Sequence, residues 1–399
     1  MRSKQIIALL IALLFGLVNL QAQTWEIWGG PNGTQTIGNV TYNHKSTTII
    51  LLEGDVTVTG TITVDNWTTL RILNLTGREY TIKNGAAGRR NTSLFKVIGG
   101  AKLAFNYTDS AFNLRLSDNS IYKTVGSDGA WSNMTASNTK YSPINLDGGT
   151  TWTPNAQGEE YYEQEVEGGG KKRVLSAAND VRFYGHAAMV ESIGALEFFK
   201  VNLRNYYAVD YFGKTNNDRA GVFAIAPRKL LEEMAAATGA QKFQYRYTHL
   251  KCCLVEKCKS RTGVFLSIDR AKGGTVGGPE LDLVNYPPDH ADRRIEVEDC
   301  TVRNCIVFGD INGWGGLIRC KGGSAHMLSL KNTTFENNFS HGDGAGLWWN
   351  AGGHSSTKCV IDGCTFKKSW DKYGLWAYGN VDVTVQNSTF ADYRGIKMY

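Results

Sequence analysis

Six short segments in the second half of the chain follow one pattern, in which apolar residues alternate with polar ones around a small polar bend. They are FFKVNLRNY (198–206), LKCCLVEKC (250–258), VEDCTVRNC (297–305), LKNTTFENN (330–338), IDGCTFKKS (361–369) and VQNSTFADY (385–393). A polar turn, a glycine and a second apolar segment follow each copy, as in GLWWN (346–350) and GLWAY (374–378). Such alternation is typical of β-strands, so each copy predicts strand, bend, strand, turn and strand.

The repeat predicts a solenoid, because one such unit cannot bury its own apolar side whereas stacked units can. Short strands with Gly, Asn and Asp at the bends favour an all-β, right-handed parallel β-helix, with neighbouring coils about 4.8 Å apart. Copies of unequal length indicate long loop insertions, which we expect at about 125–180, 227–242 and 269–292. The segment 227–239, inside the second insertion, is the one with a helical composition.

The N-terminus has the composition of a secretory signal peptide. Arg2 and Lys4 precede an apolar run over 6–18, and Ala22 is a small residue suited to the cleavage site. The run is shorter than the roughly 20 residues that a membrane span needs, and no later run is apolar enough to span a bilayer. We therefore expect 1–22 to be removed and the mature chain to be secreted or exposed at the cell surface.

The mature chain is expected to comprise a lead-in or cap over 23–45 and a β-helix over 46–399. It ends at GIKMY (395–399), in the middle of a copy, although solenoids need polar caps to stay soluble. This ending predicts that a further chain or a missing domain covers the last coil.

These repeats resemble the right-handed parallel β-helix proteins of the pectate-lyase-like superfamily, over roughly 45–399. A second resemblance is to the polymorphic outer-membrane proteins, whose passenger repeats use GG-[ALI]-[ILV] and FxxN. The segments Gly315–Ile318 and Phe335–Asn338 match those two motifs. The first resemblance implies the fold and a lyase or hydrolase acting on polysaccharide, and the second implies a surface adhesin.

Equivalent positions of stacked coils form columns, and cysteines occupy two of them. Cys253 aligns with Cys300 in the next copy, and Cys258 aligns with Cys305. Stacked neighbours have Cα atoms about 5 Å apart, which is within the range of a disulfide bond. Both pairs are therefore disulfide candidates. The alternative is that the cysteines are small buried residues with free thiols.

A second column is acidic, because Asp343, Asp371 and Asp392 each stand three residues before the glycine of the following strand. The ordinary interpretation is a row of turn residues, whose carboxylates bond nearby backbone groups. The alternative is a row of oxygen ligands for Ca²⁺, the one cofactor that the sequence suggests, or paired carboxylates for glycoside hydrolysis.

Basic residues beside this row complete the set of candidate catalytic residues. A polysaccharide lyase needs a base that takes a proton from the sugar, and Lys372 and Arg394 adjoin the acidic residues. His341 is near Asp343 and is a candidate acid or base. A solvated turn histidine is the alternative. The candidate catalytic group is therefore Asp343, Asp371, Lys372, Arg394 and His341.

A third column is aromatic. If the first apolar residue after each strand glycine points inward, the next residue points outward. The outward residues would include Phe223, Phe265, Trp348 and Trp376, whose rings could stack on sugars. The opposite parity stays open, as does the alternative that loops cover these rings and make a second small core.

A net charge of +6 over 399 residues is small, and it argues against a nucleic-acid partner. The favoured function is a secreted or surface β-helix that binds an extracellular polysaccharide or a host surface. The alternatives are a pectate-lyase-like lyase or hydrolase, and a purely structural segment of a larger surface protein.

Overall fold

The computed structural model describes most of the residues of the chain. They are 23–30, 34–85, 93–115, 121–149, 161–166, 170–175, 188–208, 221–227, 230, 231, 234, 242, 243, 246–260, 262–268, 280, 281, 294–307, 315–320, 327–340, 344–367, 373–392 and 395–398. The predicted signal peptide lies outside them.

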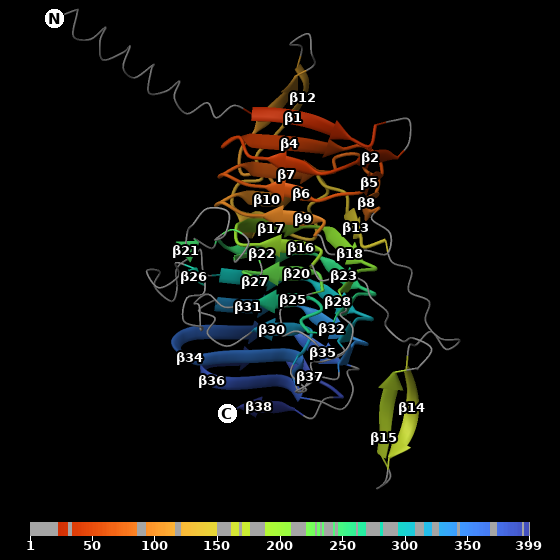
Figure 1. Ribbon diagram of the computed structural model, residues 1–399, viewed down its shortest axis with the longest axis vertical. Coiled ribbons are helices and arrows are strands. Elements are labelled where there is room, and N and C mark those ends of the chain that lie inside the picture. The colour runs from red at the N-terminus through yellow and green to blue at the C-terminus, as the bar shows by residue number, and fades with distance from the viewer. Residues whose placement is uncertain are drawn as a thin grey trace, which may run out of the picture.

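The chain winds into a parallel β-helix, which confirms the predicted fold class (Figure 1). Each coil contributes one strand to each of three parallel ladders, which we call faces A, B and C. Face A comprises β1 (Gln23–Trp28), β4 (Thr47–Leu52), β7 (Thr69–Leu73), β10 (Lys102–Phe105), β17 (Ala195–Phe199), β22 (Thr248–Lys251), β27 (Arg294–Glu298), β31 (Met327–Lys331) and the second parts of β34 (Gly344–Asp362) and β36 (Tyr373–Gln386).

Face B follows face A in every coil, and from β17 onward the two faces are joined by a tight bend of one or two residues. It comprises β2 (Gln35–Ile37), β5 (Val56–Val58), β8 (Tyr80–Asn84), β13 (Ile144–Asp147), β18 (Val201–Arg204), β23 (Leu254–Glu256), β28 (Thr301–Arg303), β32 (Thr334–Glu336), β35 (Thr365–Lys367) and β37 (Thr389–Phe390). Residues in the left-handed backbone region make the bend, as Asn332 and Asn387 do with φ of 47° and 52°. Asparagine adopts this region more readily than most side chains, which explains the polar bends of the repeat.

Face C completes each coil. It comprises β3 (Val40–Tyr42), β6 (Ile62–Val64), β9 (Phe95–Val97), β16 (Val190–Ser192), β20 (Phe223–Ile225), β25 (Leu266–Ile268), β30 (Ile318–Cys320), the first parts of β34 and β36, and β38 (Ile396–Met398). Short strands between faces B and C form a further ladder of β19 (Tyr207–Ala208), β24 (Lys259–Ser260), β29 (Ile306–Val307) and β33 (Phe339–Ser340). Two more, β21 (Lys242–Phe243) and β26 (Glu280–Leu281), pair in a loop region.

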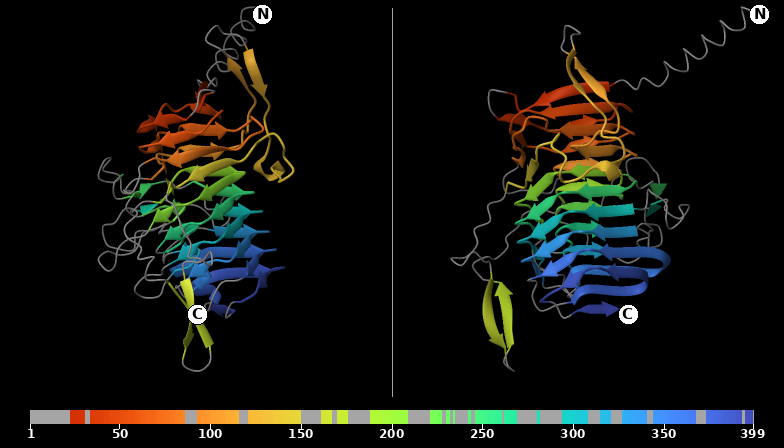
Figure 2. Two further views of the ribbon diagram at one scale, coloured as in Figure 1. Left: turned by 90° about the vertical axis from the view of Figure 1, so that its right-hand side faces the viewer. Right: turned by 180° about the vertical axis from the view of Figure 1, so that it is seen from behind.

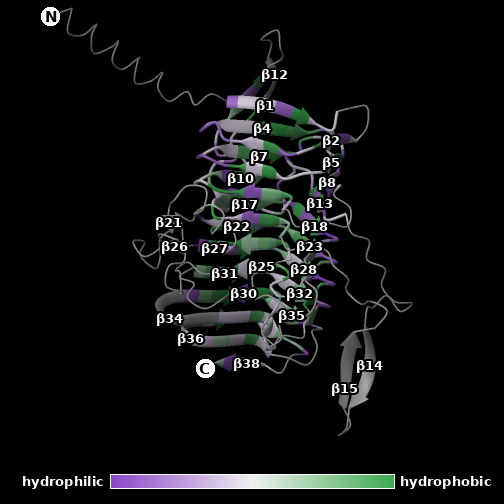
Figure 3. Ribbon diagram, in the orientation of Figure 1, coloured by the Kyte–Doolittle hydropathy of each residue, from purple (hydrophilic) through white to green (hydrophobic). Residues whose placement is uncertain are grey.

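The core fills the inside of the spiral, and hydrophobic and polar residues alternate along many strands (Figure 3). Phe335, Phe366 and Phe390, which stand at the same position of successive repeats, stack with nearly parallel rings. Their centroids are 4.5 Å and 4.6 Å apart. Identical side chains one coil apart therefore pack directly on one another, as in-register parallel strands require.

Charges of opposite sign alternate down one outward column of face B. In coil order its members are Lys83, Asp147, Arg204, Glu256, Arg303, Glu336 and Lys367. Arg303 Nη2 lies 2.9 Å from Glu256 Oε2, and Lys367 Nζ lies 3.0 Å from Glu336 Oε2. Like charges stacked on neighbouring strands would repel, so this order favours one pairing of the coils.

Two predicted boundaries are wrong. The segment 23–45, expected as a lead-in or cap, supplies β1, β2 and β3 to the three faces and is the first described coil. The stretch 125–180, expected as loop, contains β13, which pairs with β8 and β18 in face B. Ile144 and Leu146 of β13 are buried, and a period of two over four residues was too short to stand out in a polar stretch.

An insertion packs against the outside of face A. It contains an antiparallel hairpin of β11 (Phe112–Arg115) and β12 (Ile121–Val125), followed by a 3₁₀ turn, η1 (Trp131–Asn133) (Figure 2). Phe112, Leu114, Met134 and other apolar residues of the insertion form a second core with outward side chains of face A, such as Phe199. A second antiparallel hairpin comprises β14 (Tyr161–Val166) and β15 (Gly170–Leu175).

The segment predicted to be helical, 227–239, is described in part. Leu230, Leu231 and Met234 are helical, and Leu231 packs against the main core. Within the described residues, no helix has the length and apolar character needed to cross a membrane.

Candidate functional site

The predicted aromatic column lies on face C, and the structure corrects half of it. Phe223 and Phe265 point into the core, are fully buried, and have ring centroids 6.2 Å apart. They are therefore not binding residues. The cause is register: the inward residue stands one position after the glycine in the last three copies, but Phe223 stands two positions after Gly221. Through Leu266 and Ile318 it shares the column of the inward Leu347. A shift of one residue turns a side chain to the other face of a strand.

In the last coils, the side chains of these strands point inward and outward as expected. Leu347 and Trp349 belong to the core, so Trp348 between them points outward, and Trp376 lies directly beside it in the next coil. The two indole rings are stacked, with centroids 5.4 Å apart and an angle of 7° between their planes. Trp348 is nevertheless covered, with 1% of its surface exposed. The alternative interpretation, in which the ring is covered rather than open to a ligand, is therefore correct for Trp348.

The stack continues to the surface through a residue that sequence reasoning missed. Tyr378 is two positions after Trp376 on β36, and the two rings lie 6.0 Å apart at 10°. Trp376 is half-buried, and 48% of Tyr378 is exposed. At the inner end, the Arg319 guanidinium lies 5.7 Å from the Trp348 ring centroid. The result is a parallel aromatic surface over neighbouring coils, backed by a cation.

Most of the acidic and basic candidates lie outside the described residues. These are His341, Asp343, Asp371, Lys372 and Arg394. Asp392 is described: it is exposed and has a φ of 65°, which fits its interpretation as a turn residue. The described residues contain no group of three His, Cys, Asp or Glu side chains that could hold a metal ion. The Ca²⁺ site and the catalytic group stay predictions.

The cysteine columns stack as the repeat implied. Cys253 lies beside Cys300, and Cys258 beside Cys305; each pair is buried between neighbouring coils. All eight cysteines are unbonded thiols in this structure. Cys253 Sγ donates to the carbonyl of Phe198 at 3.4 Å, and burial raises the pKa of the Cys258 and Cys300 thiols well above its ordinary value. The two disulfides stay a prediction.

Exposed aromatic residues are scarce in the described part of the chain. Five large apolar side chains are exposed there: Ile27, Trp67, Tyr378, Ile396 and Met398. Ile27 lies on β1 and the last two lie on β38, so they belong to the first and last described coils. Trp67 and Tyr378 are the two that stand on the sides of the spiral. The sequence signal for Trp67 is an aromatic residue within a turn, DNW (65–67), between two strands.

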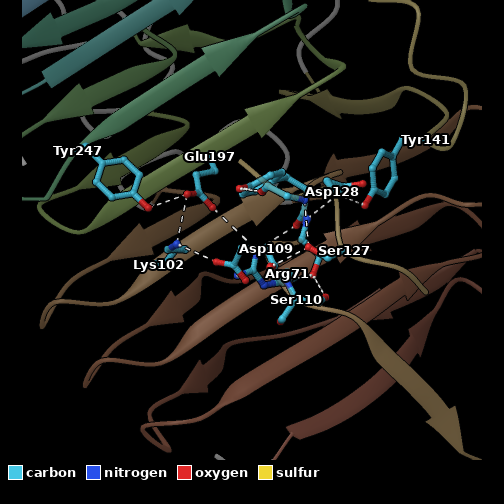
Figure 4. Close-up of polar contacts among 12 residues, drawn as sticks. Arg71, Lys102, Asp109, Ser110, Ser127, Asp128, Tyr141, Glu197 and Tyr247 are labelled. Carbon is cyan, nitrogen blue, oxygen red and sulfur yellow. Dashed lines mark hydrogen bonds and ion pairs between the residues drawn. The ribbon is translucent and has the colours of Figure 1, made fainter. Parts of the chain in front are cut away.

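Near Trp67, face A carries a buried charge network that sequence reasoning also missed (Figure 4). Arg71 Nη2 lies 2.6 Å from Asp109 Oδ1, and its Nη1 lies 3.9 Å from Glu197 Oε2. Lys102 Nζ lies 3.2 Å from Glu197 Oε1, which also accepts a 2.6 Å hydrogen bond from the hydroxyl of Tyr247. Arg71 and Glu197 are almost fully buried, so their charges balance one another inside the protein.

A second group of polar contacts, centred on Asp128, lies within the insertion. Asp128 accepts hydrogen bonds from the hydroxyl of Tyr141 at 2.6 Å and from Lys140 Nζ at 2.7 Å. Burial, then the Asp128 hydrogen bond and charge, raise the pKa of Tyr141 above its ordinary range. The phenol therefore stays protonated and joins two parts of the insertion, while the Tyr141 ring lies 6.4 Å from that of Phe199 on face A.

A histidine, His249, lies beside Glu197 in the next coil of face A. His249 packs between Tyr247 and Trp131, with ring centroids at 4.5 Å and 5.6 Å, and its Nε2 lies 3.2 Å from Glu296 Oε2. Burial outweighs the attraction of Glu296 and lowers the pKa of His249. The imidazole is thus held as part of an aromatic row.

No protein-family model, curated protein or solved structure matches this chain.

Proposed function

We propose that this chain binds an extracellular polysaccharide through the aromatic surface of its last coils. The observation that supports this is the parallel arrangement of Trp376 and Tyr378, with the Tyr378 ring half exposed on the side of the spiral. The face of a sugar ring carries C–H groups that pack on aromatic faces, and a tyrosine adds a hydroxyl for hydrogen bonding. Export by the predicted signal peptide would bring this surface to such a ligand.

The surface is preorganised, which favours binding of a rigid ligand. Trp376 cannot rotate freely, because the buried Trp348 ring is stacked on it from the preceding coil. Lys397, which pairs with Trp376 in the next coil, has its ammonium 5.0 Å from the Tyr373 ring centroid. The aromatic ring of Tyr373 and the cationic group of Lys397 therefore lie next to the proposed surface.

The test is a screen of the mature chain, residues 23–399, against acidic and neutral polysaccharides by affinity electrophoresis and calorimetry. Trp376→Ala with Tyr378→Ala should weaken binding of the retained glycan by roughly tenfold to a hundredfold, the loss expected for two aromatic contacts. Thr384→Ala, an exposed position further along the same strand, is the control and should bind like the parent.

Trp348 is a poor choice for this test, since truncating a buried indole would disturb folding. Circular dichroism should show the same strand content in all variants. Binding that is retained in the double variant, or no binding of any polysaccharide by the parent, would contradict the proposed function.

A further inference from the structure

Trp67 has a left-handed backbone conformation, which residues other than glycine rarely adopt. Asn66 and Trp67 have φ of 53° and 60°, one after the other. In the next coil the same turn is built from Gly99 and Gly100, whose φ values are 58° and 73°. The turn therefore calls for two residues in the left-handed region. The chain meets this with glycines in one coil and with a bulky indole in the other.

The surroundings of Trp67 are built to hold this indole. Its backbone N–H donates to the carbonyl of Gly99 at 2.9 Å. A Cβ at Gly100 would come within 2.8 Å of the Trp67 ring, so the ring fits in this position only because residue 100 has no side chain. Trp67 as a whole still has 55% of its surface exposed, so burial does not explain why a tryptophan occupies a strained position. Residues held in strained backbone are often functional.

Arg246 lies beside this ring and has no acidic partner among the described residues. Its guanidinium carbon is 6.0 Å from the Trp67 ring centroid and 5.9 Å from that of Tyr247. Nη1 donates to the carbonyl of Gly100 at 2.8 Å, which fixes the side chain and leaves other N–H donors for a ligand. A half-buried guanidinium between two aromatic rings is suited to a planar carboxylate, which it can bind with two hydrogen bonds.

The third side chain, Tyr247, is positioned by the charge network. Its hydroxyl is bound to Glu197, which Lys102 holds from the other side, and the Lys102 ammonium lies 5.6 Å from the Tyr247 ring centroid (Figure 4). Burial and the negative charge of Glu197 raise the pKa of Tyr247, so the phenol remains a hydrogen-bond donor. The ring therefore has a fixed position beside Arg246.

We infer that Trp67, Arg246 and Tyr247 form a second binding site, which takes a carboxylate-bearing sugar unit of a polysaccharide. Arg246 binds the carboxylate, and the Trp67 ring packs on the sugar. This site lies at the turns that lead into β7 and β22 of face A, whereas the proposed site at Trp376 and Tyr378 lies on face C in the last coils. It extends the proposed function but stands on separate residues.

The experiment compares polygalacturonate with its fully methyl-esterified form, which has the same sugar backbone without the negative charge. Titration calorimetry is done on the mature chain carrying Trp376→Ala and Tyr378→Ala, so that the first site is already removed. In this background, acidic polymer should still bind and the esterified polymer should bind at least tenfold more weakly. Adding Arg246→Gln should weaken binding of the acidic polymer by roughly tenfold to a hundredfold, as expected for a lost hydrogen-bonded charge.

Two further variants separate recognition from folding. Trp67→Gly suits the left-handed turn, so it should keep the thermal midpoint of the parent while it weakens binding of the acidic polymer. Arg246→Lys keeps the charge but not the paired donors and should fall between the parent and Arg246→Gln. Arg294→Gln, on a half-exposed arginine of face A, is the matched control and should bind like its parent.

The outcomes for the two sites are distinguishable. If Trp376→Ala with Tyr378→Ala abolishes all binding of acidic polymer, or if Trp67→Gly and Arg246→Gln leave it unchanged, the second site is wrong. If the acidic polymer binds but loses affinity only in the Trp67 and Arg246 variants, the second site is supported and the surface at Trp376 is not. Equal binding of acidic and esterified polymer would also overturn the second site.

Discussion

The hydroxyl of Tyr247 donates a 2.6 Å hydrogen bond to Oε1 of Glu197, and this contact joins two neighbouring coils of face A. Glu197 has about 5% of its side chain exposed, and it also faces Arg71 and Lys102. Its Oε2 has no hydrogen-bond donor among the described residues. One buried carboxylate therefore determines where two cations and a phenol lie.

Glu197→Gln should lower the free energy of unfolding by about 3 kcal/mol, because it leaves buried cations with one carboxylate fewer. Urea denaturation measures this. Glu296→Gln is the matched control: it is two coils further along the same column, 35% of its side chain is exposed, and its loss should cost less than about 1 kcal/mol. Equal effects of the two substitutions would contradict a special role for the buried network.

Acid should destabilise the protein through Asp109. Burial acts to raise the pKa of this carboxyl, but the charges of Arg71 and Lys102 outweigh it, so the pKa lies below its ordinary value. A carboxyl whose pKa is depressed in the folded state stabilises that state above its unfolded pKa, and the contribution is lost as the pH falls through the folded pKa.

Stability should therefore fall as the pH drops below about 4, the unfolded pKa of aspartate. Unfolding midpoints in urea between neutral and acid pH measure the slope. Asp109→Asn should be less stable at neutral pH and should show a shallower decline in acid. An unchanged slope in this variant would show that other groups, such as Glu298, account for the effect.

The stacked phenylalanines give a test of core packing with an internal comparison. Phe366 is fully buried, whereas Phe390, at the same position of the next coil, is half-buried. Phe366→Ala should cost about 4 kcal/mol, the usual range for a buried aromatic residue, and Phe390→Ala clearly less. A larger effect at Phe390 would contradict the described end of the core.

Reversing one charge of the face B column should weaken the coil pairing. Glu256→Arg would place three cations in sequence, at Arg204, position 256 and Arg303, and should cost about 1 kcal/mol at low salt. Raising the salt concentration should reduce this cost, because screening acts on partly exposed charges. A cost that does not depend on salt would indicate a packing effect instead.

The sequence predicted the solenoid because its signal is repeated. Phe335, Phe366 and Phe390 recur at one position of the repeat, and the structure stacks them as the pattern requires. Register within a repeat was less predictable. The glycine of each copy looked like a fixed reference point, but Phe223 stands two positions after it, whereas the inward residue of the last copies stands one position after it. Phe265 lies just before β25, outside the alternation of that strand, and it belongs to the core.

The site at Trp67 could not be found by comparing repeats. Trp67 lies in a different coil from Arg246 and Tyr247, outside the clean part of the pattern, and only the winding of the chain brings the three together. The strain at Trp67 is a backbone property that no composition reveals. What the sequence does contain is an indole in a two-residue turn, a position at which glycine or asparagine would be ordinary.

The alternation of charge on face B has a consequence for how such a spiral can grow or shrink. Removing a single coil, for example the one that carries Arg303, would bring Glu256 next to Glu336, and adding one would create the same conflict elsewhere. Removing two coils together restores opposite neighbours. Within the coils that carry this column, losing two adjacent coils therefore keeps every pair of neighbours opposite in charge, whereas losing one does not.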